Sequence, residues 1–180
     1  MEDNAVRALP SGEKRKDHSL IFCFFYLIGV ILGYRLFDRI FVLEPAAIGR
    51  ADLIALLAFS FVPVLLLIFF STSTVGWFAI PVVFLSKGFS VSTDVSVLLR
   101  YGVGIAKTGL IVAFPNLLFL GALLYLGETS AEKSLILRSN DRFYADFCPV
   151  QSDKGKLTAA AILVCLSAMI KSGIYRFLTE

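Results

Sequence analysis

Residues 53–70 read LIALLAFSFVPVLLLIFF, an apolar run without a charged side chain. At about 1.5 Å per residue, a helix over this run is about 27 Å long, just enough to cross the hydrocarbon of a bilayer. Pro63 lies in the middle of the run, and the kink that it causes is tolerated where neighbouring helices pack around it. The run therefore predicts a membrane-spanning helix.

The rest of the 180-residue chain has the same character. Hydrophobic residues make up 57% of it and charged residues 17%, against about 45–50% and about 25% in soluble proteins. A chain of this length has too little interior to bury so much apolar surface. The composition argues against a soluble enzyme, a disordered chain, a disulfide scaffold and a coiled coil. The net charge of +3 is too small to indicate a nucleic-acid partner.

Four further apolar runs predict an all-α, polytopic membrane protein with about five transmembrane helices. Residues 1–19 are predicted to be a basic cytoplasmic tail with His18 in solvent, and residues 127–156 a polar loop. Residues 75–104 are mixed in character, so a re-entrant hairpin is the alternative there. The predicted spans, all within one domain over 20–178, are 20–37, 53–70, 75–91, 105–126 and 157–178.

The distribution of positive charge predicts the orientation. The tail holds four Lys or Arg residues and the 127–156 loop holds five, and positive segments remain in the cytoplasm. Four spans between the two segments place both on the same side, whereas a re-entrant 75–104 would leave one of them outside. We therefore expect the N-terminus in the cytoplasm and the C-terminus outside.

Motifs for catalysis, metal binding or cofactor binding do not occur in the sequence. There is no H-E-x-x-H, G-x-S-x-G or phosphate-binding loop, and the three cysteines lack metal-ligand spacing. We expect a protein that is not an enzyme and that holds neither a metal nor a cofactor.

A few charged side chains lie inside or beside the predicted spans. Lys87, Asp94, Arg100 and Lys107 interrupt apolar residues. Charges at membrane depth are costly and often line ion or substrate paths. The alternative is that these side chains lie near one membrane surface, where a lysine near a helix end reaches the interface.

Two further patterns concern helix geometry. Asn116 follows Pro115 inside an apolar run, where the proline leaves the carbonyl of Ile111 without its helical partner. This pair predicts either a satisfied structural kink or a functional pivot. Gly29 and Gly33 form a GxxxG pair on one helical face, which favours the close approach of another helix.

Three stretches carry a family resemblance. Residues 25–33 read FYLIGVILG, residues 79–90 read AIPVVFLSKGFS and residues 113–127 read AFPNLLFLGALLYLG. They resemble, in order, the glycine-paired first helix, the lysine-glycine core helix and the proline-centred segment of the stage II sporulation protein M family. The resemblance extends over about residues 20–142.

The resemblance implies a membrane-embedded component of engulfment during endospore formation, without catalysis or a cofactor of its own. It implies two peptidoglycan hydrolases as partners, an amidase/endopeptidase and a lytic transglycosylase, in addition to the lipid bilayer. For helix packing or a partner interface, it points to Gly29, Gly33, Pro81, Lys87, Gly88, Pro115, Asn116 and Gly121.

The chain departs from the family pattern in two places. Pro115 directly precedes Asn116, where family members often place a glutamine between them. Residues 38–52 form a short loop, where sporulation-type members often carry a longer polar segment. This second departure leaves little outer surface for recruiting hydrolases.

A small permease or transporter subunit that works with a separate ATPase is the alternative function. It would need a water-filled path near Lys87, Asp94, Lys107 and Asn116. Residues 127–156 would supply its cytoplasmic coupling surface.

Overall fold

The computed structural model describes residues 18–40, 53–100, 102, 104–139 and 154–179. Every regular element of this part is an α-helix, so the predicted all-α fold is confirmed. The predicted tail over residues 1–17 and the loop over 140–153 lie outside the described residues. The helices are α1 (Ser19–Ile40), α2 (Leu53–Ser71), α3 (Gly76–Arg100), α4 (Ile105–Ser139) and α5 (Lys154–Thr179).

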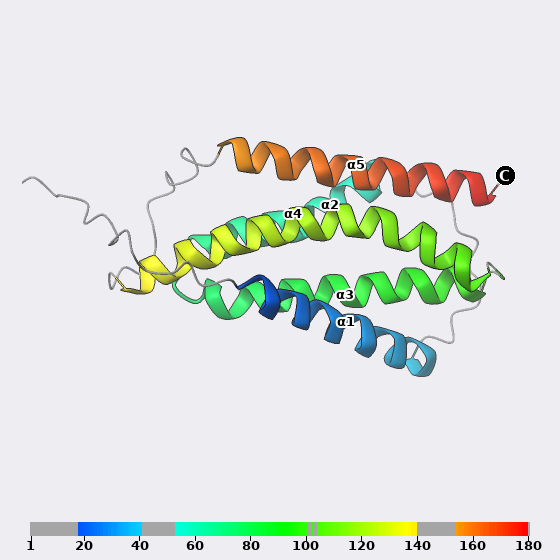
Figure 1. The fold of residues 1–180 in the computed structure, drawn as a ribbon, viewed down its shortest axis with the longest axis horizontal. Coiled ribbons are helices and arrows are strands. Elements are labelled where there is room, and N and C mark those ends of the chain that lie inside the picture. Colours follow the sequence, from blue (N-terminus) through cyan, green and yellow to red (C-terminus); the bar gives the residue numbers. More distant parts are fainter. Residues whose placement is uncertain (1–17, 41–52, 101, 103, 140–153, 180) are drawn as a thin grey trace, which may run out of the picture.

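The helices form an elongated bundle in which direction alternates along the chain (Figure 1). Helices α1, α3 and α5 run one way, and α2 and α4 run the other. α4 contacts each of the other four helices, α1 packs chiefly on α3, and α5 packs on α4 and α2. The start of α1 and the end of α4 therefore lie at the same end of the bundle.

All five helices contribute to the buried core, and its largest side chains come from α1, α3 and α4. The rings of Phe22 and Phe84 are stacked, with their centroids 4.8 Å apart, and both side chains are fully buried. Gly127 on α4 gives these rings room, because a Cβ at this position would lie 2.9 Å from the Phe84 ring. Between membrane helices such rings stabilise the bundle through close van der Waals packing.

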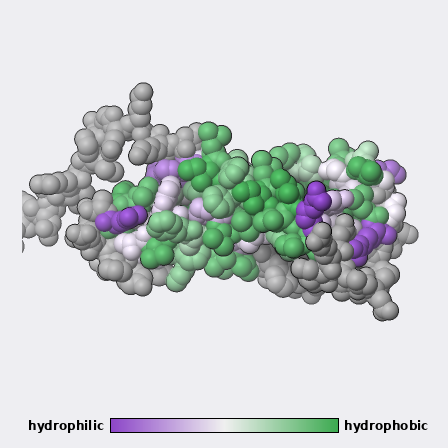
Figure 2. All heavy atoms as spheres, turned by 90° about the horizontal axis from the view of Figure 1, so that it is seen from below, coloured by the Kyte–Doolittle hydropathy of each residue, from purple (hydrophilic) through white to green (hydrophobic). Residues whose placement is uncertain are grey.

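The outer surface is apolar as well, which is the pattern of a membrane protein. Leu27, Leu65, Val82, Leu117 and Met169 come from five different helices, and all are exposed. Figure 2 shows hydrophobic side chains over the middle of the molecule and hydrophilic ones toward its two ends. A soluble protein of this size rarely exposes so continuous an apolar surface.

Three helical segments are long and apolar enough to cross a membrane: Ser19–Leu36, Gly76–Arg100 and Ile105–Arg138. Within the described residues, α2 and α5 contain the shorter apolar segments Ser60–Ser71 and Leu157–Gly173. The chain is therefore a helical membrane protein.

Two helices, α3 and α4, continue nine or more residues beyond their predicted ends. α3 is one continuous helix of 25 residues, so it passes residue 91 and leaves no turn for a re-entrant hairpin. α4 has 35 residues, so residues 127–139 are helix and not loop. The apolar run ends at residue 126, but residues beyond it still bury one face: Ala131, Ser134 and Leu137 are all buried. An amphipathic segment with good helix formers continues a helix past the end of its apolar run.

Candidate functional site

Three charged side chains, Lys87 and Asp94 on α3 and Lys171 on α5, are partly buried in the bundle. Lys171 on α5 donates a hydrogen bond to Asp94 on α3 and forms an ion pair with it. Their side chains are only 18% and 21% exposed. Because α3 and α5 do not pack directly over the described residues, this pair is a polar link between helices that are not neighbours.

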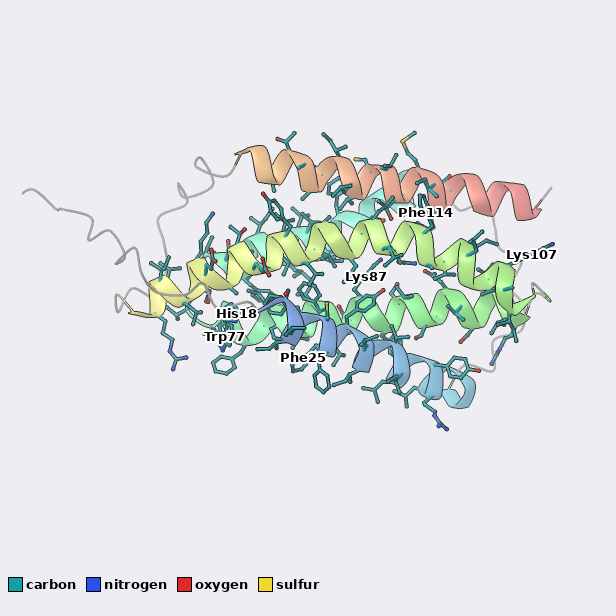
Figure 3. All side chains as sticks on the ribbon, in the orientation of Figure 1. His18, Phe25, Trp77, Lys87, Lys107 and Phe114 are labelled. Atoms are coloured by element: carbon teal, nitrogen blue, oxygen red, sulfur yellow. The ribbon has the colours of Figure 1, made fainter. Side chains whose placement is uncertain are left out.

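Lys87 lies between α3 and α4, near the middle of the bundle (Figure 3). Its Nζ atom lies 4.0 Å from the centroid of the Phe119 ring on α4, within the range of a cation–π interaction. Lys87 and Asp94 are seven residues apart on α3, so both lie on the same face of this helix. The alternative that Lys87 reaches a membrane surface is therefore wrong, because its ammonium group faces α4.

Lys107 and Arg100 do not belong to this group. Both side chains are exposed, and both lie where α3 ends and α4 begins. Figure 3 places Lys107 at one end of the molecule, far from Lys87 along the bundle. Of the path predicted for a permease, the structure brings together Lys87 and Asp94 but not Lys107.

The glycines of α1 and α3 bring two helix backbones together. A Cβ at Gly88 would lie 2.9 Å from the Val30 nitrogen and closer still to the Tyr26 carbonyl oxygen. A Cβ at Gly29 would lie 2.9 Å from the Leu85 carbonyl carbon. Real Cβ atoms essentially never come that close, so only glycine fits at these points. The predicted GxxxG face thus lies directly against α3.

Gly33 lies on the same face of α1, one turn beyond Gly29. A Cβ at Gly33 would lie 3.0 Å from the Phe89 carbonyl oxygen and would fall on the Ser92 hydroxyl. Gly121 on α4 is different, because nothing lies within 4 Å of its Cβ position and the residue is exposed. Gly121 is therefore not a helix-packing residue within the described bundle.

The proline and asparagine of α4 form a local arrangement with one contact to α5. The side-chain amide of Asn116 donates a 2.7 Å hydrogen bond to the Val112 carbonyl oxygen of its own helix. The hydroxyl of Ser167 on α5 donates a 2.7 Å hydrogen bond to the Pro115 carbonyl oxygen. Pro115 was predicted to leave the carbonyl of Ile111 without its helical partner. The Asn116 amide binds the next carbonyl, that of Val112, and not that of Ile111.

Pro81 is half-buried in the second turn of α3. Its missing N–H removes the helical hydrogen bond to the Trp77 carbonyl oxygen.

His18 is buried, so its predicted position in a solvated tail is wrong. Only 8% of the residue is exposed. Its ring meets Trp77 edge to face, with the centroids 4.9 Å apart. Figure 3 shows the two side chains together at the start of α1 and α3. An imidazole ring can pack against an indole ring. The polar composition of residues 1–19 does not predict this contact.

The Ser134 side chain on α4 binds the turn between α2 and α3. This residue was not identified from the sequence, because residues 127–156 were predicted to be a loop. Its hydroxyl accepts a 2.9 Å hydrogen bond from the Trp77 N–H and donates a 2.8 Å hydrogen bond to the Ser73 carbonyl oxygen. The serine is fully buried. It therefore satisfies one of the free amides at the start of α3 from another helix.

Lys171 was also missed as a site residue. The signal for it was present, since it is a charged residue inside the last apolar run. Its partner lies 77 residues earlier in the chain, and no local pattern connects the two.

Among the described residues, no group of three or more His, Cys, Asp or Glu side chains is arranged to hold a metal ion. The charged group instead offers two ammonium groups and one carboxylate in a setting of low polarity. Such a group can hold helices together, or it can bind an ion or a polar solute.

No protein-family model matches the chain, and neither curated proteins nor solved structures contain a match. The resemblance to the stage II sporulation protein M family rests on the three quoted stretches alone.

Proposed function

We propose that this chain is a non-enzymatic membrane scaffold of the engulfment and peptidoglycan-remodelling machinery in endospore formation. In this proposal five spans place the N-terminus in the cytoplasm and the C-terminus outside. The alternating helix directions support that arrangement, because the described residues next to both basic segments lie at one end of the bundle. An amidase/endopeptidase and a lytic transglycosylase would be its partners.

The observation that carries this proposal is the use of the family-like motifs in helix contacts. Gly88 is pressed against the backbone of α1, Lys87 covers the Phe119 ring, and the Pro115 carbonyl oxygen binds α5. Residues that hold helices in fixed positions suit a protein whose work is to position others.

A partner protein must bind to a surface that is not buried between the helices of the bundle. Gly121 lies on such a surface, because nothing lies within 4 Å of its Cβ position. Gly109 is equally open on the same helix and serves as its matched control. A Cβ at either position meets nothing within 4 Å, and both residues are exposed, so leucine is the substitution chosen for the test.

The decisive experiment is deletion of the gene in its own host, followed by membrane-dye microscopy through starvation. Septa that form without migration of the membrane around the forespore support the scaffold proposal. Normal engulfment, or a host that makes no spores, contradicts it.

Complementation of the deletion then locates the partner surface. If α4 contacts a hydrolase around Gly121, Gly121→Leu should fail to restore engulfment or hydrolase co-purification, while Gly109→Leu restores both. If the two variants behave alike, that face of α4 is not the partner surface.

A small permease subunit working with a separate ATPase is the second candidate. The observation that favours it is the charged group of Lys87, Asp94 and Lys171 inside the bundle, because charges at membrane depth often mark a solute path. Uptake or export by reconstituted vesicles is the test. Transport that requires the ATPase and is lost on Asp94→Asn, but not on Lys107→Met, would favour this function over the scaffold.

A further inference from the structure

The charged group inside the bundle is not electrically balanced. It contains two ammonium groups, Lys87 and Lys171, and one carboxylate, Asp94. The carboxylate is engaged by Lys171. Among the described residues Lys87 has no hydrogen-bond acceptor and no carboxylate partner; its ammonium lies over the Phe119 ring.

Lys87 is half-buried and lies far from both ends of its own helix. It lies about 17 Å from the start of α3 and about 20 Å from its end, at 1.5 Å per residue. A lysine side chain does not reach that far. The Phe119 ring supplies a cation–π contact, which does not replace the hydration that an ammonium loses on burial.

The neighbouring ion pair does not compensate the charge of Lys87. Asp94 lies two turns from Lys87 on the same face of α3, and its carboxylate is already engaged by Lys171. An anion beside Lys87 would therefore be attracted by the Lys87 ammonium group, because the Lys171–Asp94 pair carries no net charge.

Asn116 lies one turn before Phe119 on the same buried face of α4. One of its two side-chain N–H groups is bound to Val112. The other can serve as a neutral donor at the same level of the bundle. Ammonium and amide donors in a setting of low polarity are the chemistry that recognises an anion.

We propose that Lys87, between α3 and α4, binds a small anion of single charge. A single charge is expected because the three side chains together leave one positive charge. A halide ion and the carboxylate group of a small organic acid share this chemistry. Binding can be measured on the purified chain and does not depend on either proposed function.

The test uses the full-length protein purified in detergent with gluconate, a bulky anion, as the only added anion. Chloride or acetate is then titrated in at constant ionic strength. Unfolding on heating is followed by the fluorescence of Trp77, the single tryptophan of the chain. A ligand that binds only the folded state raises the unfolding temperature in a saturable way.

We expect the unfolding temperature to rise with chloride, with acetate, or with both. A response to chloride alone identifies a halide site, and a response to acetate alone identifies a carboxylate site. Lys87→Met should abolish the response, whereas Lys107→Met, at an exposed lysine, should leave it unchanged. An unfolding temperature that is independent of both anions in the unaltered protein overturns the proposal.

Lys87→Arg protects the test against a folding defect. It keeps the positive charge, so the response should persist with a changed midpoint concentration. If Lys87→Met responds to the anions like the unaltered protein, or if Lys87→Arg folds but no longer responds, Lys87 is not the binding group.

Discussion

A methyl group at position 88 should force α1 and α3 apart. In Gly88→Ala the new Cβ would lie 2.9 Å from the Val30 nitrogen and 3.0 Å from the Tyr26 carbonyl carbon. Ordinary van der Waals contact begins at 3.4 Å, so these backbones must withdraw by about half an ångström, and the Tyr26 carbonyl oxygen by more. Both obstacles are helical backbone, which cannot turn aside as a flexible side chain does.

The expected cost follows from overpacking. Extra methyl groups in a packed interior cost about 1–3 kcal/mol, and alanine recovers up to about 1 kcal/mol through its higher helix propensity. We expect Gly88→Ala to lower the free energy of unfolding by about 1–2 kcal/mol. Gly121→Ala meets nothing within 4 Å, so only the gain in propensity remains and its effect should be neutral or stabilising.

The assay is unfolding by sodium dodecyl sulfate in mixed micelles, followed by Trp77 fluorescence and by circular dichroism. Gly29→Ala, on the other side of the same contact, should behave like Gly88→Ala. The reasoning is refuted if Gly88→Ala unfolds at the same detergent fraction as Gly121→Ala, because the close approach of α1 and α3 would then not limit the bundle.

Further predictions concern the polar links and the orientation. Asp94→Asn should cost about 2–4 kcal/mol in the same assay, because it leaves Lys171 charged and unpaired, while the double variant with Lys171→Met should recover most of that loss. Equal stability of the single and double variants would show that the pair is uncoupled. Ser134→Ala should cost about 1–2 kcal/mol, since it removes two hydrogen bonds at the α2–α3 turn; an unchanged unfolding midpoint contradicts this. Ser167→Ala should cost about 0.6 kcal/mol through the lost bond to α4, measured as a small fall in the unfolding midpoint. Cys148 lies outside the described residues, and the expected orientation makes it cytoplasmic; labelling by a membrane-impermeant maleimide in intact cells would overturn that orientation.

Hydropathy was sufficient to place the helices. In hydrocarbon a backbone must satisfy its own hydrogen bonds, so an apolar run of sufficient length becomes a helix whatever surrounds it. α2 begins at residue 53 as predicted and ends one residue beyond the predicted end. α4 extends 13 residues further than its apolar run, to Ser139. Hydropathy does not predict this extension. Residues 127–139 are helical because one face of the segment is still buried against the bundle.

The GxxxG pattern predicted a close contact but not its partner. Gly29 and Gly33 face α3, and Gly88 completes the contact from the other side. Gly121 lies in a similar apolar setting, yet it faces open space. The difference depends on where the other helices lie, which the spacing of residues along one helix does not contain.

The sequence by itself determined that this is an all-α membrane protein, and it located the apolar part of each helix, because both follow from local apolarity and the demands of the backbone. Only the tertiary structure decided that Lys87 faces Phe119, that Asp94 pairs with Lys171, and that His18 is buried against Trp77. These contacts join residues far apart in the chain. Their energies depend on distance and burial in three dimensions, so the order of residues alone does not fix them.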